Sequence, residues 1–143
     1  IGVGYTLPFE TFAAEWIDAD ALNDELDSYR LPGTAFRTIH YKPIAGSSQG
    51  KLIHGVQYFF TDYSAACISL TQFYVMQALH RLYPGRDPFK MAAGRTSMFD
   101  KICGTDYVRE TFSKRLEVSD IVDYWNKDAE DFRTLSSKYH LYK

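Results

Sequence analysis

The sequence predicts an α+β domain with a small, mainly antiparallel sheet, helices packed on that sheet, and a helical C-terminal half. Three observations lead to this prediction. Residues 52–60 read as a strand, residues 67–83 form an apolar helical run, and the chain after residue 85 reads as nearly all helix. The chain also lacks the series of strand–helix–strand units that a Rossmann domain requires.

The first predicted element is a helix that Asp18 can cap. Its apolar face, at spacings i, i+4 and i+7, consists of Leu22, Leu26 and Tyr29. The segment Leu31-Pro32-Gly33 should end it. Thr34 to Tyr41 is rich in β-branched and aromatic residues and is predicted as a strand, followed by a loop from Pro43 to Gly50.

Leu52 to Phe60 is the strongest predicted strand, and we expect it to be central. Alternation would place Leu52, His54, Val56, Tyr58 and Phe60 on one face and Ile53, Gly55, Gln57 and Phe59 on the other. Gly55 has no side chain, so another group can approach the backbone closely there. Gln57 brings an amide donor and acceptor to the same face.

The remaining predicted elements are helices. Cys67 to Tyr83 should be a helix with Ile68, Val75, Leu79 and Leu82 on its inner stripe, ended by Tyr83-Pro84-Gly85. Residues 85–97 are predicted to be irregular, Met98 to Cys103 a short helix, and Thr105 the cap of another. A last long helix beginning at Ser119 or Asp120 would carry Ile121, Trp125, Phe132 and Leu135 on one side, and Tyr139 to Tyr142 is a candidate edge strand.

Composition and charge exclude several classes of protein. A chain of 143 residues is predicted to be a single domain, 1–143. Its net charge of −2 favours neither nucleic acid nor an anionic membrane, and its apolar runs are much shorter than the ~20 residues of a membrane span. Aromatic residues make up 16% of the chain, so rings can fill the core, line a groove for a flat ligand, or do both.

Motifs for cofactors and metals have little support. The segment Gly46 to Lys51 resembles a phosphate-binding loop, but it has three residues between its glycines and Leu52 where Ser or Thr should follow. The four histidines form no metal-binding pattern, so we expect neither a metal nor a cofactor. His54, beside Gly55, is either a half-buried, hydrogen-bonded histidine or a ligand contact. Cys67 and Cys103 are predicted to be buried free thiols rather than a disulfide.

Two carboxylates differ from those on the solvated helix faces. Glu10 follows Pro8-Phe9 in a short apolar turn, and Asp62 follows Thr61 at the end of the best strand. Each can be a cap or turn residue, or each can bind a ligand hydroxyl. We predict that Glu10, Gly55, Gln57 and Asp62 cluster around a concave surface. Tyr5 would add a stacking or hydroxyl group.

An ordered set of short motifs resembles the C-terminal half of the exo-β-N-acetylmuramidase (NamZ-like) family. The set opens with Gly2-Val3-Gly4, Thr6-Leu7-Pro8-Phe9-Glu10 and Trp16-Ile17-Asp18. It continues through Leu31-Pro32-Gly33, Phe36, Pro43, Gly55-Val56-Gln57, Thr61-Asp62, Phe99-Asp100, Gly104-Thr105-Asp106, Arg109, Trp125, Phe132-Arg133 and residues 139–142. Members usually carry Arg and Thr where this chain has Val3 and Tyr5, and often a small residue in place of His54.

The resemblance implies a role in cleaving amino-sugar glycans. It implies an auxiliary domain of a glycoside hydrolase that removes terminal N-acetylmuramic acid from peptidoglycan fragments during cell-wall turnover and recycling, in a periplasmic or secreted setting. It also implies a partner, an N-terminal Rossmann-like domain of the same protein, which would carry the catalytic carboxylate. Because the chain starts with Ile1 rather than Met, we expect it to be a C-terminal fragment that is inactive alone.

Two other interpretations remain open from the sequence. The chain can be a non-catalytic module that binds a glycan or a protein through its aromatic surface. It can also be a self-contained small hydrolase, which the lack of a GxSxG motif or metal pattern disfavours. The coding region upstream of Ile1 would discriminate best.

Overall fold

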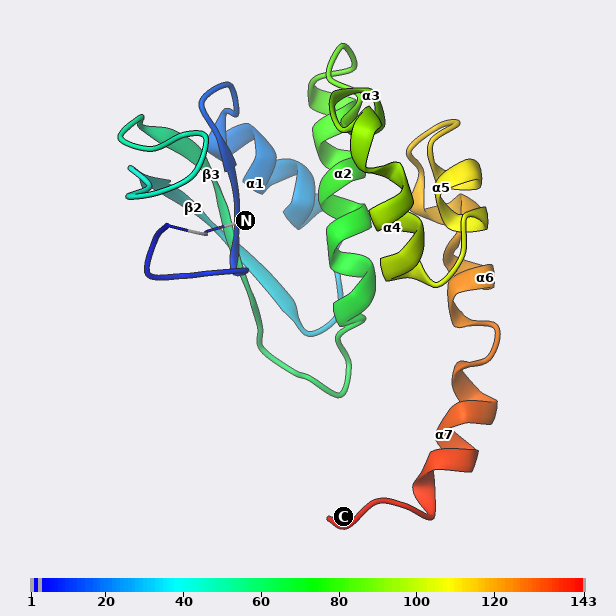
Figure 1. Cartoon of the computed structure of the whole chain (residues 1–143). Coiled ribbons are helices and arrows are strands. Elements are labelled where there is room, and N and C mark those ends of the chain that lie inside the picture. The colour runs from blue at the N-terminus through cyan, green and yellow to red at the C-terminus, as the bar shows by residue number, and fades with distance from the viewer. Residues whose placement is uncertain (1, 3, 143) are drawn as a thin grey trace. The chain divides into compact units, whose positions relative to one another are not determined.

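The computed structural model of the chain describes residue 2 and residues 4–142 (Figure 1). It divides into two compact units, Ile1–Arg86 and Asp87–Lys143. Within the described residues, the first unit carries the sheet and two longer helices, and the second is helical. The predicted α+β class, with a small antiparallel sheet and a helical C-terminal half, is confirmed.

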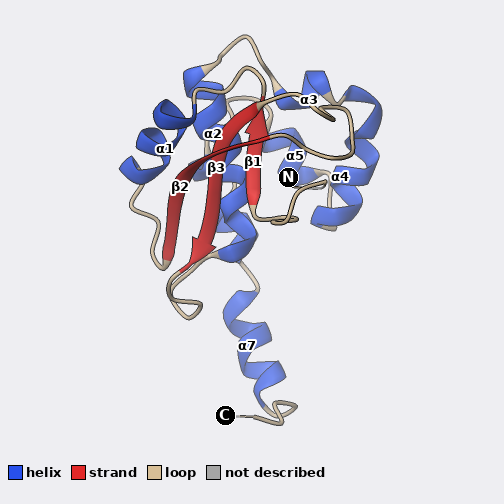
Figure 2. Cartoon of the chain, turned by 90° about the vertical axis from the view of Figure 1, so that its left-hand side faces the viewer, coloured by secondary structure: helices blue, strands red, loops and turns tan. Residues whose placement is uncertain are grey.

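The sheet has three strands, β1 (Thr11–Ala14), β2 (Thr34–Tyr41) and β3 (Ile53–Phe60) (Figure 2). The order is β1-β3-β2, and both outer strands run antiparallel to β3, so the prediction of a central strand flanked by residues 34–41 is confirmed. The sequence did not predict β1, because a four-residue strand with two alanines has almost no pattern of its own.

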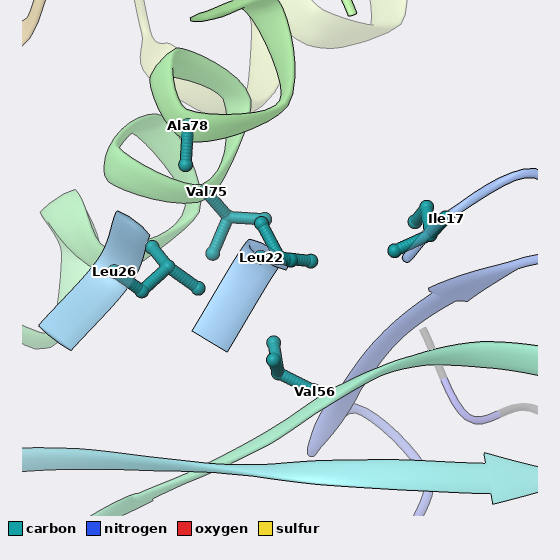
Figure 3. Packing of buried hydrophobic residues seen from close by; sticks show 6 residues of the cluster. All are labelled: Ile17, Leu22, Leu26, Val56, Val75 and Ala78. Carbon is teal, nitrogen blue, oxygen red and sulfur yellow. The ribbon is translucent and has the colours of Figure 1, made fainter. Parts of the chain in front are cut away.

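Two helices lie on one side of the sheet, the first directly on the strands and the second packed on the first. Helix α1 (Ala19–Ser28) begins as predicted, because the Asp18 Oδ1 atom accepts hydrogen bonds from the backbone N–H groups of Asp20 and Ala21 at 3.1 Å. It packs on β2 and β3, and helix α2 (Thr71–Leu82) packs on α1. Figure 3 shows Leu22 and Leu26 of α1 between Val75 and Ala78 of α2 and Val56 of β3. Both leucines are fully buried.

The start of α2 differs from the prediction. Residues Ile68–Leu70 form a 3₁₀ turn, η1, and the α-helix starts only at Thr71. Ile68 is about half exposed and does not belong to the inner stripe, because the tighter turn changes the direction of its side chain. Both cysteines are free, as expected, but Cys67 is exposed and Cys103 only partly covered.

The second unit contains short helices. They are α3 (Pro88–Met91), η2 (Ala93–Arg95), α4 (Thr96–Cys103), α5 (Tyr107–Phe112), η3 (Val118–Asp120), α6 (Val122–Asn126) and α7 (Ala129–Ser137). The buried apolar residues here are Val108, Phe112, Leu116, Val118 and Ile121. No helix in the described part of the chain has the length and apolar character needed to cross a membrane.

Three predictions about the second unit were wrong. Residues 85–97 include α3, since Asp87 caps that helix through hydrogen bonds to the backbone of Phe89 and Lys90, and Pro88 occupies its first turn. The predicted last helix is broken around Asp128, whose φ of −107° and ψ of 4° leave the helical region. Residues 139–142 form no strand.

Candidate functional site

The candidate site centres on Gln57, which lies in the middle of β3. Its side chain is only 7% exposed and lies on the face opposite Val56 and the helices. The Gln57 Nε2 atom donates to Glu10 Oε2 at 3.0 Å, and the Arg37 Nε atom donates to Gln57 Oε1 at 2.7 Å. These bonds orient the amide and form a polar row, Arg37–Gln57–Glu10, across the sheet.

The register of the sheet explains how this row forms. Arg37 of β2 lies directly opposite Gln57 in the antiparallel pairing, and Thr11 of β1 lies opposite it on the other side. Cross-strand neighbours are close enough for direct side-chain contact. Glu10 immediately precedes β1, which brings its carboxylate alongside the same glutamine.

Hydrogen bonds from Tyr58 of β3 hold Glu10 and the turn before it in place. The backbone N–H of Tyr58 donates to the Glu10 carbonyl at 3.0 Å, and the Tyr58 hydroxyl donates to the Phe9 carbonyl. Phe9 has a positive φ of 65°, which turns the chain sharply before the strand. Burial, followed by the negative charge of Glu10, raises the pKa of Tyr58, so this hydroxyl stays a hydrogen-bond donor.

The close approach expected at Gly55 is made by the chain itself. Gly55 lies opposite Ala13, and a Cβ atom built on it would lie 2.0 Å from the carbonyl oxygen of Phe12. The backbone of β1 therefore occupies the space that the missing side chain leaves free. The glycine allows β1 to pair with β3 and thereby places Glu10 beside Gln57.

Tyr5, in the opening segment, packs on the sheet face that carries Gln57. Its ring stacks on that of Tyr41 with centroids 4.2 Å apart, and the Tyr41 hydroxyl shares a 2.9 Å hydrogen bond with Thr11 Oγ1. The Gly4 carbonyl accepts a hydrogen bond from the Ile44 N–H at 2.7 Å, which ties the opening segment to the loop after β2. A pocket lies between them, lined by Gly2, Ala13, Tyr41, Pro43, Ala45, Gly46, Ser47, Ser48 and Ile53.

His54 lies on the opposite face of the sheet from Gln57. It pairs with His40 across β2 and β3, and the two Nδ1 atoms are 2.7 Å apart. The pair lines a separate open pocket together with Glu15, Trp16, Ile17, Asp18, Ala19 and Asp20. No group of three or more His, Cys, Asp or Glu side chains in the described residues is arranged to hold a metal ion.

Asp62 stands apart from the polar row. Its Oδ1 atom accepts from the Ser64 N–H at 2.8 Å, the Ser64 hydroxyl at 2.6 Å and the Ala65 N–H at 3.3 Å. These bonds, led by the Ser64 hydroxyl, lower the pKa of Asp62 and close a local turn. The backbone N–H of Asp62 also donates to the Gly33 carbonyl, which fixes the end of β3 beside the turn after α1.

The structure thus brings together only part of the predicted set. Glu10 and Gln57 are in direct contact, Gly55 lies beside them, and Tyr5 belongs to the same face, whereas Asp62 and His54 lie elsewhere. Sequence reasoning missed Arg37. The sequence placed Arg37 in the predicted strand 34–41 but could not say which residue it faces. Only the strand register places it opposite Gln57.

The row presents two kinds of exposed charged group to a polar ligand. Glu10 accepts hydrogen bonds from hydroxyl or amide groups, while Arg37 carries a guanidinium suited to a carboxylate. Both side chains are exposed, and Gln57 beneath them orients both. Asp62, by contrast, has its carboxylate oxygen engaged in its own turn.

Comparison with known proteins gives a consistent result. Residues 1–142 match the family model described as "Exo-beta-N-acetylmuramidase NamZ, C-terminal". The chain is 33% identical over 141 residues to the peptidoglycan beta-N-acetylmuramidase NamZ of Bacillus subtilis (strain 168), covering 99% of this chain and 33% of that protein.

A solved structure also resembles the chain closely. It is the crystal structure of a DUF1343 family protein from Bacteroides fragilis NCTC 9343, with a TM-score of 0.93 and 46% sequence identity. The match covers 99% of this chain and 37% of that one. The chain thus spans about a third of the length of the relatives that it matches.

Proposed function

The chain belongs to the family of C-terminal domains of the exo-β-N-acetylmuramidase NamZ, and from this premise we propose that it is the auxiliary C-terminal domain of a longer glycoside hydrolase. That enzyme would remove terminal N-acetylmuramic acid from peptidoglycan fragments in cell-wall turnover and recycling. The relative from Bacillus subtilis bears the name of such an activity. Residues 1–143, with their two compact units, would act as one domain beside an N-terminal partner domain.

The observation that carries this proposal is the polar row Arg37–Gln57–Glu10 on the sheet face away from the helices. An N-acetylmuramic acid unit offers hydroxyl groups, an acetamido group and a lactyl carboxylate. Glu10, oriented by the Gln57 amide, would bind the hydroxyl or acetamido groups. The Arg37 guanidinium would bind the carboxylate, as arginine does at many carboxylate sites.

Arg37 also bears on a departure from the family pattern. Val3 stands where family members usually have an arginine, and Val3 lies outside the described residues. In our proposal Arg37 supplies a guanidinium that this chain lacks at residue 3. Its contact with Gln57 at 2.7 Å would hold the positive charge in one position.

The proposal assigns positioning, not bond cleavage, to this domain. Most glycoside hydrolases use two carboxylic groups that flank the scissile bond. The row offers a single carboxylate, Glu10, which Gln57 already orients. The reacting groups would therefore lie in the N-terminal partner domain, and this domain would form one wall of a shared cleft that excludes water.

The test compares the chain 1–143 with the full-length protein on 4-nitrophenyl N-acetylmuramide. We expect turnover by the full-length protein and none by the isolated chain. Comparable turnover by both would contradict the proposal. No turnover by either, together with binding of a peptidoglycan fragment or a protein by the isolated chain, would favour the alternative of a non-catalytic binding module.

A further inference from the structure

The C-terminal segment 126–142 carries an apolar surface that nothing in its own unit covers. Every residue in this range is exposed except the half-buried Ser136. The large apolar side chains among them are Phe132 at 67% exposed, Leu135 at 56%, Tyr139 at 72%, Leu141 at 90% and Tyr142 at 89%. Figure 1 shows α7 following α6, with the chain end just beyond it.

These side chains are not scattered at random. Phe132 and Leu135 stand at i and i+3 on one face of α7, and Tyr139 lies in the turn that follows the helix. The polar side chains lie between them, and the Arg133 Nη1 atom contacts Glu130 Oε2 at 2.6 Å. The segment therefore has the pattern of a helix that packs against something.

A helix of this length is not expected to form without a partner. Helix α7 has nine residues and none of them is buried. Isolated helices shorter than about 12–15 residues are marginal in water, and helices in proteins gain most of their stability by packing an apolar face. The helical conformation and the exposed stripe together indicate a surface that is covered in the functional protein.

We propose that this C-terminal apolar surface docks on the N-terminal partner domain of the same polypeptide. It is formed by Phe132 and Leu135 of α7 and by Tyr139, Leu141 and Tyr142 after the helix. This inference rests on the proposed function for the existence of that domain. The two relatives extend well beyond the region they share with this chain, which covers 33% of one and 37% of the other. The partner would present an apolar groove that accepts one helix face and two tyrosine rings.

A tethered domain is favoured over a second copy of the chain because the tether makes the contact intramolecular. Buried aromatic side chains contribute roughly 150–250 Å² each, so the three aromatics alone supply roughly 450–750 Å². A stable interface between separate proteins buries about 800 Å² on each partner. Contacts between domains of one chain need less, because the tether supplies a high effective concentration.

Hydrogen–deuterium exchange of the full-length protein and of the chain 1–143 tests this docking. We expect the backbone amides of α7 to exchange about tenfold more slowly in the full-length protein than in the isolated chain. Equal exchange in both would overturn the proposal. Protection that disappears on dilution, with a dimeric mass at high concentration, would also overturn it, since a second copy would then be the occupant.

A pair of variants of the full-length protein makes the test specific. The double change Phe132→Asp with Leu135→Asp places charges on the docking face, and we expect it to abolish the protection of α7. Thr134→Asp adds a charge on the opposite side of the same helix and should leave the protection intact. Loss of protection in Thr134→Asp as well would show that the helix itself had melted, and would overturn the assignment of the face.

The exchange readout is independent of sugar hydrolysis. Protection of α7 in a protein without muramidase activity would leave the docking in place and remove the proposed function. An active enzyme with an unprotected α7 would overturn the docking and leave the proposed function in place.

Discussion

Side chains alternate between the two faces of the three-stranded sheet, and different kinds of interaction dominate on each face. The face that carries Val56 lies under α1, with α2 packed on that helix, and its core is an aliphatic cluster with aromatic rings packed around it. The face that carries Gln57 is covered by the opening segment and the loop after β2, and its contacts are hydrogen bonds and a ring stack.

This difference separates the face that stabilises the fold from the face that can bind a ligand. Aliphatic packing is non-directional and stabilises in proportion to buried area, so the helix-covered face holds the fold together. Hydrogen bonds among Arg37, Gln57 and Glu10 add little net stability but fix the direction of each group. In the middle of β3, Val56 therefore serves the core and the adjacent Gln57 serves the candidate site.

The largest expected effect comes from the helix-covered face. Leu22→Ala removes a fully buried side chain from the centre of the cluster with Val56 and Leu26. The change should lower the free energy of unfolding by roughly 2–5 kcal/mol, measured by chemical denaturation. Leu52→Ala, at a side chain that is 48% exposed, is the control and should cost far less. Equal losses would contradict the assignment of the core to this face.

Gly55→Ala tests the backbone contact on the other face. The added Cβ would lie 2.0 Å from the Phe12 carbonyl oxygen, so β1 must shift away from β3. We expect a loss of about 1–3 kcal/mol in the free energy of unfolding, the usual cost of forcing extra atoms into a packed site. Gly85→Ala is the control, since its Cβ would meet nothing within 4 Å. An unchanged stability would mean that β1 is only loosely paired.

Gln57→Ala in the full-length protein separates recognition from stability. Loss of the amide frees Arg37 and Glu10 to adopt other positions. Transition-state binding, from kcat/KM on the muramide substrate, should weaken by roughly 1–3 kcal/mol while the melting temperature changes little. Gln72→Ala, at an exposed amide on α2, should change neither. A large fall in stability with normal kinetics would make Gln57 a structural residue.

The smallest expected effect concerns Asp62, at the end of β3. Its pKa is lowered, first by the Ser64 hydroxyl, so its stabilising hydrogen bonds exist above the usual aspartate pKa and are lost as the pH falls through the lowered value. Asp62→Asn should therefore slightly lower the melting temperature at neutral pH, and the difference from the parent should vanish in acid. A changed kcat/KM with an unchanged pH profile of stability would return Asp62 to the candidate site.

Sequence patterns predicted most of the first unit because its signals are local. The capping of α1 by Asp18 and the burial of Leu22 and Leu26 follow from residue type and spacing. The alternation in residues 53–60 correctly separated Val56 from Gln57. Predictions failed where the signal was short or uniform: β1 has four residues, and the break near Asp128 interrupts a pattern that otherwise reads as helix throughout.

The candidate site shows the limit of such reasoning. Glu10 and Gln57 were predicted together, and the structure places them 3.0 Å apart. Arg37 was missed, and Asp62 and His54 are separated from Gln57 by a local turn and by the sheet itself. Proximity between residues far apart in the chain depends on strand register, and one residue of slip moves every side chain to the other face.

By itself, the sequence determined the longer elements of the first unit, the faces of β3, and the family to which the chain belongs, because these depend on residue types and spacings along the chain. Only the tertiary structure decided that β1 uses the space beside Gly55 and that Arg37 joins Gln57 and Glu10. It also decided that the stripe on α7 stays exposed. These outcomes depend on which segments pair and pack, and many pairings satisfy the same local pattern.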